Sequence, residues 1–139
     1  MSKVAVVYWS GTGNTEAMAD AVAKGIQEKG GTADIIGAAD FDSAKAAEYD
    51  AIAFGCPAMG DEALEEMTFE PMYDAVKGSL GDKKVALFGS YDWHDGEWMD
   101  YWKEDAEGAG LNIVATCICK DAPDEAAAQE CADLGAALV

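Results

Sequence analysis

Basic side chains are scarce in this sequence: nine lysines and no arginine stand against 27 Asp and Glu residues, which gives a formal net charge of −18 over 139 residues. A field of this sign repels nucleic acid and anionic membrane surfaces, and it attracts partners that carry a basic face. The chain also has no apolar run long enough to span a bilayer, and residues 1–3 lead directly into an apolar stretch, leaving no room for a signal peptide. We therefore expect a cytoplasmic protein that binds neither nucleic acid nor membranes.

Histidine is scarce and the CxxC motif is absent: the chain has one His and four Cys, and no two cysteines have CxxC spacing. This spacing predicts buried free thiols, with a disulfide or a metal site as the less favoured alternative. Cys117 and Cys119 alternate with their neighbours in an expected strand, so both should face the same side of it. His94 has no recognisable Ser or Cys nucleophile beside it, and we expect no catalytic residues and no metal ligands.

What the chain does have is a regular alternation of apolar runs and helical patterns. Apolar runs typical of strands in a parallel sheet occur at residues 4–9, 32–36, 50–56, 83–89 and 111–118. Helical spacing occurs at residues 15–29, 44–48, 64–76, 97–107 and 123–138, and Pro71 is expected to interrupt the third of these. The alternation predicts an α/β fold, a doubly wound five-stranded parallel sheet with helices on both faces, in one domain over residues 1–139.

The loop after the first apolar run, residues 10–15 (SGTGNT), carries glycines, hydroxyls and an amide but no basic side chain. A strand followed by a Gly-rich loop and a helix presents backbone N–H groups and a helix N-terminus to an anion. The loop lacks the Lys-Ser/Thr of nucleotide-triphosphate loops and the third glycine of the dinucleotide fingerprint. It predicts a site in which neutral donors hold a phosphate; on this loop alone, an ordinary polar turn is an equally good interpretation.

Two further loops complete the expected site, because ligands of doubly wound sheets bind beyond the carboxyl ends of the strands. Residues 57–62 follow the third strand and offer Met59, an apolar and polarizable side chain whose alternative role is to fill a gap in the core. Residues 90–96 follow the fourth strand and place Trp93 among small and acidic residues, where it can stack on a planar ligand. Together with the phosphate loop, these side chains indicate a flat, phosphorylated cofactor.

The same loops carry a resemblance to a known family. Residues 8–16, 55–62 and 87–91, the last continued by residues 96–99, closely resemble the flavodoxins, and specifically the short-chain type of clostridia and related anaerobes. The resemblance covers the whole chain, which lacks the segment that long-chain flavodoxins insert in their last strand. It implies the strand order 2-1-3-4-5, of which flavodoxins are the standard example, with FMN where the strand order reverses.

The resemblance also implies a role for each part of the site. Residues 10–15 and Ser90 would hold the FMN phosphate, and Met59 and Trp93 would cover the two faces of the isoalloxazine ring. The implied cofactor-binding residues are Ser10, Gly11, Thr12, Gly13, Asn14, Thr15, Pro57, Ala58, Met59, Gly60, Asp61, Glu62, Ser90, Tyr91, Asp92 and Trp93.

Four places in the loops expected around the flavin ring have a particular implied role or depart from the family. Glu62 stands where the family has a carboxylate near the flavin N3–H, and the peptide between Gly60 and Asp61 stands where the family has a backbone unit that reorients on reduction. The chain departs from its near relatives at Asp92, where many of them have glycine. It also departs at His94 and Asp95, which replace the small residues that the relatives have beside the stacking Trp.

The function implied is a low-potential one-electron carrier between redox enzymes, in which non-covalently bound FMN shuttles between its semiquinone and anionic hydroquinone forms. Surrounding carboxylates disfavour the added negative charge and so lower the potential. The expected partners are redox proteins with a basic docking face, and the chain is expected to be a monomer. The alternative on this fold is an FMN-dependent NAD(P)H quinone or nitro reductase, for which Trp93 is expected to close the space that a nicotinamide needs. A phosphoacceptor receiver domain is excluded because Ser10 and Pro57 stand where it requires acidic residues.

Overall fold

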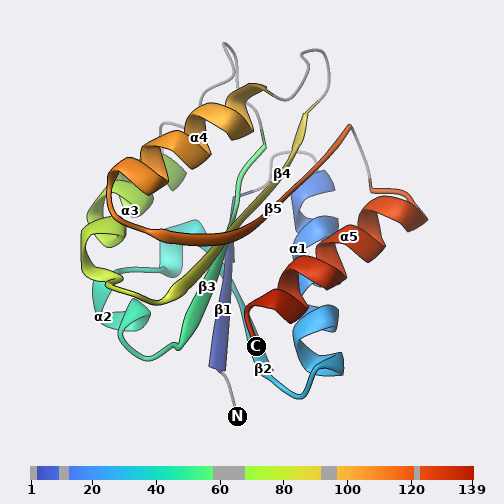
Figure 1. The fold of residues 1–139 in the computed structure, drawn as a ribbon, viewed down its shortest axis with the longest axis horizontal. Helices are drawn as coiled ribbons and strands as arrows, with labels where there is room; N and C mark the ends of the chain where they lie inside the picture. Colours follow the sequence, from blue (N-terminus) through green and yellow to red (C-terminus); the bar gives the residue numbers. More distant parts are fainter. Residues whose placement is uncertain (1–2, 10–12, 58–67, 92–96, 121–122) are drawn as a thin grey trace.

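The chain folds around one twisted parallel sheet. A computed structural model describes residues 3–9, 13–57, 68–91, 97–120 and 123–139. The strands are β1 (Lys3–Tyr8), β2 (Thr32–Gly37), β3 (Ala51–Gly55), β4 (Lys84–Tyr91) and β5 (Asn112–Lys120). They pair in the order β2-β1-β3-β4-β5, every pair parallel (Figure 1), which confirms the predicted fold class and strand order.

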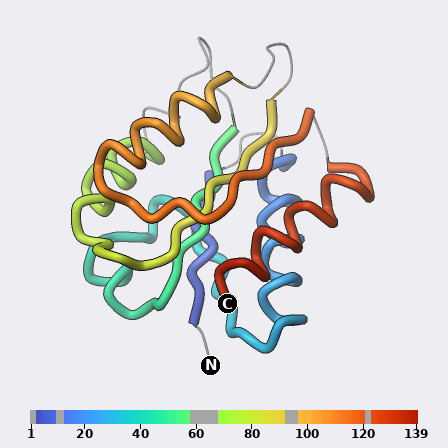
Figure 2. Tube along the Cα trace, viewed as in Figure 1, coloured from blue at the N-terminus to red at the C-terminus, as the bar shows by residue number. Residues whose placement is uncertain are grey.

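Helices cover both faces of this sheet. In Figure 1, α1 (Asn14–Glu28) and α5 (Glu125–Ala137) lie on one face, while α3 (Phe69–Val76) and α4 (Glu97–Gly108) lie on the other, with the short α2 (Ser43–Ala46) beside them. Single 3₁₀ turns occur at Ala38–Asp40 and Lys77–Ser79. Figure 2 shows the start of β1 and the C-terminus after α5 at the amino-terminal edge of the sheet, the edge at which Lys3 pairs with Thr32. No helix in these ranges combines the length and the apolarity needed to cross a bilayer.

The two faces are packed differently. The core under α3 and α4 is aromatic: Phe54 of β3 meets the Tyr73 ring edge-on at a centroid distance of 5.5 Å, and Trp102 meets Phe69 at the same distance. Edge-to-face pairs of this kind add to the stabilisation that comes from burying the rings. Among the described residues, the buried core under α1 and α5 consists of Val, Ala, Ile, Met, Leu and Cys with one aromatic residue, Phe88, and the partly buried Tyr8 packs against it.

Small side chains on that second face let α1 and α5 approach until their backbones touch. A Cβ added to Gly25 of α1 would fall on the backbone carbonyl of Ala132 in α5, and one added to Gly135 would fall on the carbonyl of Val22. Neither glycine has a positive φ, so here glycine is required for space and not for backbone conformation.

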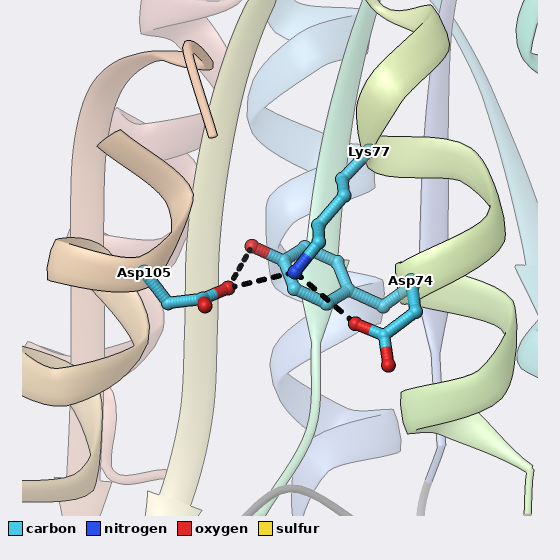
Figure 3. A network of polar contacts seen from close by, with 4 residues as sticks. Asp74, Lys77 and Asp105 are labelled. Atoms are coloured by element: carbon cyan, nitrogen blue, oxygen red, sulfur yellow. Dashed lines mark hydrogen bonds and ion pairs between the residues drawn. The ribbon is translucent and has the colours of Figure 1, made fainter. Parts of the chain in front are cut away.

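A polar contact joins α3 to α4 at the rim of the aromatic core (Figure 3). Lys77 Nζ lies 3.1 Å from Asp74 and 3.2 Å from Asp105, and the Tyr73 hydroxyl donates to Asp105 at 3.4 Å. Burial, together with the Asp105 charge, raises the pKa of Tyr73, which keeps this hydroxyl a donor.

The structure differs from the sequence-based expectations at two places. Pro71 does not interrupt a helix: α3 begins at Phe69, so Pro71 lies in its first turn, where a missing N–H leaves no intrahelical bond unmade. Strand β4 runs to Tyr91 and does not end at Gly89. Gly89 lies within the strand and pairs with Ile118. A glycine is required there because the Cys56 carbonyl, at the end of the neighbouring strand, approaches too closely for any Cβ.

Candidate cofactor site

The carboxyl ends of β1, β3 and β4 come together at one edge of the sheet, at the top of Figure 1. The backbone bonds the three ends to one another: Trp9 N–H donates to the Gly55 carbonyl at 3.0 Å, and Cys56 N–H donates to the Phe88 carbonyl at 3.1 Å. This edge is where the strand order reverses, because β1 is followed along the chain by β2 on one side and paired with β3 on the other. Helix α1 begins at the same edge.

Gly13 forms the joint between the phosphate-loop sequence and α1. It is the N-cap residue of the helix, with φ at +92°, a conformation that side-chain-bearing residues rarely adopt. The first N–H groups of any helix have no partner within the helix, and a glycine N-cap brings no side-chain oxygen to cap them. Together with the helix dipole, they make the start of α1 favourable for an anion.

A second segment contributes to this point. The hydroxyls of Thr15, in the first turn of α1, and Ser90, near the end of β4, lie 3.1 Å apart although 75 positions separate the residues. Thr15 is 1% exposed and Ser90 4% exposed. In a pair of hydroxyls only one donates to the other, so the second hydroxyl keeps a proton that can be donated to a further acceptor. The structure thus brings together two predicted phosphate ligands from separate loops.

The charges around the start of α1 are negative. Glu16 occupies the exposed first turn, and burial, with the charges of Glu16 and Asp20, raises the pKa of the nearby Tyr8. The first lysine after the loop is Lys24. The donors that the described residues bring to this point are neutral hydroxyl, amide and backbone groups, a set that would suit a phosphate monoester.

Six of the sixteen predicted site residues lie in the described ranges, namely Gly13, Asn14, Thr15, Pro57, Ser90 and Tyr91. Pro57 follows β3, and its carbonyl accepts a hydrogen bond from the Cys56 thiol at 3.5 Å. The Tyr91 ring packs against Trp98, with 5.7 Å between ring centroids, so this side chain belongs to the rim of the aromatic core. Outside the described residues lie Ser10, Gly11, Thr12, Ala58, Met59, Gly60, Asp61, Glu62, Asp92 and Trp93, together with residues 94–95.

Two supporting residues behind the site were not anticipated. Gly89 lets the Cys56 carbonyl approach β4, and Gly55 makes room for the Phe88 ring. A glycine inside a strand pattern is itself a signal of close backbone approach, and this signal was available at both positions. All four cysteines are buried thiols, which confirms that prediction, and the described ranges hold no cluster of three or more His, Cys, Asp or Glu suited to a metal ion.

A five-stranded parallel sheet of this order is the flavodoxin-like doubly wound fold, in which ligands bind at the switch point, here beside a helix N-terminus and the Thr15–Ser90 hydroxyl pair. Comparison with known proteins extends this to the family. Residues 6–135 match the flavodoxin family model, and the chain belongs to the flavodoxin family.

Individual relatives agree over nearly the whole chain. The flavodoxin of Megasphaera elsdenii is 44% identical over 134 residues, 96% of each chain, and that of Clostridium beijerinckii is 47% identical over 131 residues, 94% of each. The solution structure of two-electron reduced Megasphaera elsdenii flavodoxin superposes with a TM-score of 0.90 and covers 97% of both chains. As a member of this family the chain is an electron-transfer protein that uses a flavin, and the predicted recognition and function are confirmed.

The geometry of Gly13 leads to a first testable prediction. Gly13→Ala should destabilise the protein by about 1–2 kcal/mol, because alanine resists positive φ. If the phosphate site needs this backbone conformation, FMN affinity should also fall by about tenfold.

Gly30 provides a matched control at the other end of α1. It has φ +94° and, like Gly13, nothing within 4 Å of an added Cβ. Gly30→Ala should therefore lower the urea midpoint by a similar amount while leaving FMN affinity unchanged. Equal FMN dissociation constants for the two variants and the parent would show that the Gly13 conformation is irrelevant to the site.

Proposed function

We propose that residues 1–139 form a single FMN-binding domain that works as a low-potential one-electron carrier. We choose FMN because the buried hydroxyls of Thr15 and Ser90 meet at the start of α1, and the described first turn of this helix contains no lysine. Neutral donors converging on one point suit the terminal phosphate of a mononucleotide. When bound, the flavin ring supplies the ability to take up and release single electrons.

We assign a role to residues in each of the three loops that follow β1, β3 and β4. Residues 10–15 and Ser90 bind the phosphate, and Met59 and Trp93 enclose the ring. Glu62 lies near its N3–H, and the remaining site residues line the loops between. The described residues support this assignment at its base, because β1, β3 and β4 deliver all three loops to one edge.

The acidic composition contributes to the low potential. Reduction of the flavin adds negative charge, and nearby carboxylates such as those of residues 61–62 make that charge less favourable. The reduced flavin is therefore disfavoured, and it passes its electron on readily. The same field attracts redox proteins with a basic docking face, to which a monomeric carrier would bind transiently. The monomeric state and the cytoplasmic location remain predictions.

Equilibrium dialysis tests the cofactor. One FMN should bind per chain, and FAD, whose phosphates are internal, should bind much more weakly. The purified protein should not oxidise NADPH or NADH steadily in the presence of a quinone or a nitroarene. A preference for FAD would overturn the phosphate assignment, and steady nicotinamide oxidation would make the protein a reductase.

The charge of −18 leads to a prediction about encounter with partners. Electron transfer to a basic c-type cytochrome should slow by about tenfold as ionic strength rises from 0.01 to 0.5 M, because the Debye length contracts from about 30 Å to a few Å. Stopped-flow rates give the measurement, and an uncharged quinone serves as the control acceptor whose rate should not change. A flat rate with the cytochrome would exclude electrostatic steering.

A further inference from the structure

Two thiols from different elements touch one another under the outer edge of the sheet. Cys117 lies on β5, the last strand of the sheet, and Cys131 lies on α5, which covers it. Their Sγ atoms are 3.5 Å apart, and the side chains belong to residues that are 5% and 0% exposed respectively. The flavodoxin function uses neither thiol, because the site edge described above is formed by β1, β3 and β4.

The other two cysteines are directed elsewhere. The Cys119 thiol, on the same face of β5, contacts Met18 Sδ of α1 at 3.4 Å, and the Cys56 thiol donates to the Pro57 carbonyl. The 117–131 pair is the described thiol–thiol contact at hydrogen-bond distance, and Cys119 lies close enough to Cys131 for its charge to raise the pKa of the Cys131 thiol.

The two members of the pair are not equivalent. The hydrogen bond from Cys131 lowers the pKa of the Cys117 thiol, and the same bond, with burial, raises that of Cys131. The Cys117 thiol donates to Glu130 Oε2 at 4.0 Å, and the charge of this carboxylate, together with burial, opposes the lowering of the Cys117 pKa. The arrangement thus has a nucleophilic sulfur, Cys117, and a second thiol directly behind it.

A groove of about 270 Å³ lies between β5 and α5, lined by Ala115, Thr116, Glu130, Asp133 and Leu134. Thr116 immediately precedes Cys117, and Glu130 contacts its sulfur. The groove therefore lies directly beside the pair, and of the two cysteines Cys117 keeps 5% exposure while Cys131 has none.

We propose that Cys117 and Cys131 form a peroxide-sensitive dithiol that closes to an intramolecular disulfide between β5 and α5. Cys117, as thiolate, attacks one peroxide oxygen; the O–O bond breaks, leaving a sulfenic acid on Cys117, and the released hydroxide takes up a proton to leave as water. Cys131 then attacks the Cys117 sulfur, the S–O bond breaks, and a second water leaves with the Cys131 proton. Two thiols and one peroxide give one disulfide and two waters.

The closure requires a modest movement. The sulfurs must approach from 3.5 Å to the disulfide bond length of about 2.05 Å. The disulfide would tie α5 to β5 across residues 117–131 and so constrain the unfolded chain. We expect the oxidised protein to unfold at a higher urea concentration than the reduced protein, and dithiothreitol to reverse the shift.

Mass spectrometry of the full-length protein, reduced, desalted and treated with hydrogen peroxide, tests the proposal. The monomer should lose the mass of two hydrogen atoms, and thiols titratable after unfolding should fall from four to two. Trypsin leaves Cys117 and Cys119 on one peptide, residues 104–120, so a peptide map cannot tell which of the two is linked to Cys131. The Cys119→Ala variant removes this ambiguity, and the disulfide should still form in it.

Two further variants test the order of events. Cys131→Ser should stop at a sulfenic acid on Cys117 that dimedone labels, and Cys117→Ser should give neither label nor disulfide. The proposal is overturned by a link that involves Cys119 or Cys56, by disulfide-joined dimers, or by four intact thiols after peroxide treatment of the parent chain. Over-oxidation of Cys117 with Cys131 still a thiol would overturn it equally.

Discussion

Gly25→Ala should lower the free energy of unfolding by about 2–3 kcal/mol, although alanine is the better helix former. The added methyl group would occupy the position of the Ala132 backbone carbonyl, and a backbone cannot move aside as a flexible side chain can. Helix α1 must then move away from α5, which loosens the core of small residues beneath both helices. Urea unfolding should show a midpoint lower by about 1–2 M with an unchanged slope.

Gly108 gives the matched control for this substitution. It is also a helical glycine, the last residue of α4, and an added Cβ would meet nothing within 4 Å. Gly108→Ala should therefore leave stability unchanged or raise it by about 0.5–1 kcal/mol. Gly135→Ala, whose Cβ would meet the Val22 carbonyl, should behave like Gly25→Ala. If Gly25→Ala matched Gly108→Ala, the two helices would not be in backbone contact.

The sheet could be predicted because its strands are nearly continuous apolar runs. The central strand β3 is buried at every position, and its sequence AIAFG has no polar residue. Pattern alone did not provide the order of the strands, because crossovers of similar length are compatible with several orders. The order came from the resemblance to flavodoxins, and the pairing of β1 with both β2 and β3 confirmed it.

Contacts between segments that are far apart along the chain could not be predicted from the sequence pattern. Gly25 and Gly135 read as weak points of two helical patterns, because only the helix–helix distance shows that a side chain has no room there. Likewise, the contact of Cys117 with Cys131 depends on the rotation of α5 about its own axis, which periodicity fixes too coarsely to align two sulfurs.

The sequence predicted which loops form the candidate site, but it did not predict the contacts that hold these loops together. The three strands that lead into the predicted site loops end at one edge of the sheet, as expected of parallel neighbours, and the loops themselves remain a prediction. Thr15 and Ser90 were each expected to bind phosphate, but their direct hydrogen bond joins segments 75 residues apart. That bond shows how the start of α1 is attached to β4, a feature that the composition of neither loop contains.

Thr12→Asp should weaken FMN binding by at least a hundredfold while leaving riboflavin binding within a few-fold of the parent. Thr12 directly precedes the Gly13 N-cap of α1, so the new carboxylate would compete with the phosphate for the same backbone donors. It would also repel the phosphate: two like charges about 5 Å apart near a protein surface cost roughly 3 kcal/mol. Riboflavin has no phosphate and does not experience this repulsion.

Thr12→Asn separates charge from shape, because asparagine has the size of aspartate without its charge. It should lower FMN affinity by no more than about tenfold, the equivalent of one lost hydrogen bond. Fluorescence titration of the apoprotein with FMN and with riboflavin measures all four combinations. Raising the salt concentration should recover part of the FMN affinity of Thr12→Asp and none of that of Thr12→Asn. Equal losses of FMN and riboflavin in Thr12→Asp would mean that this loop does not hold the phosphate, and the neutral-donor site at the start of α1 would have to be abandoned.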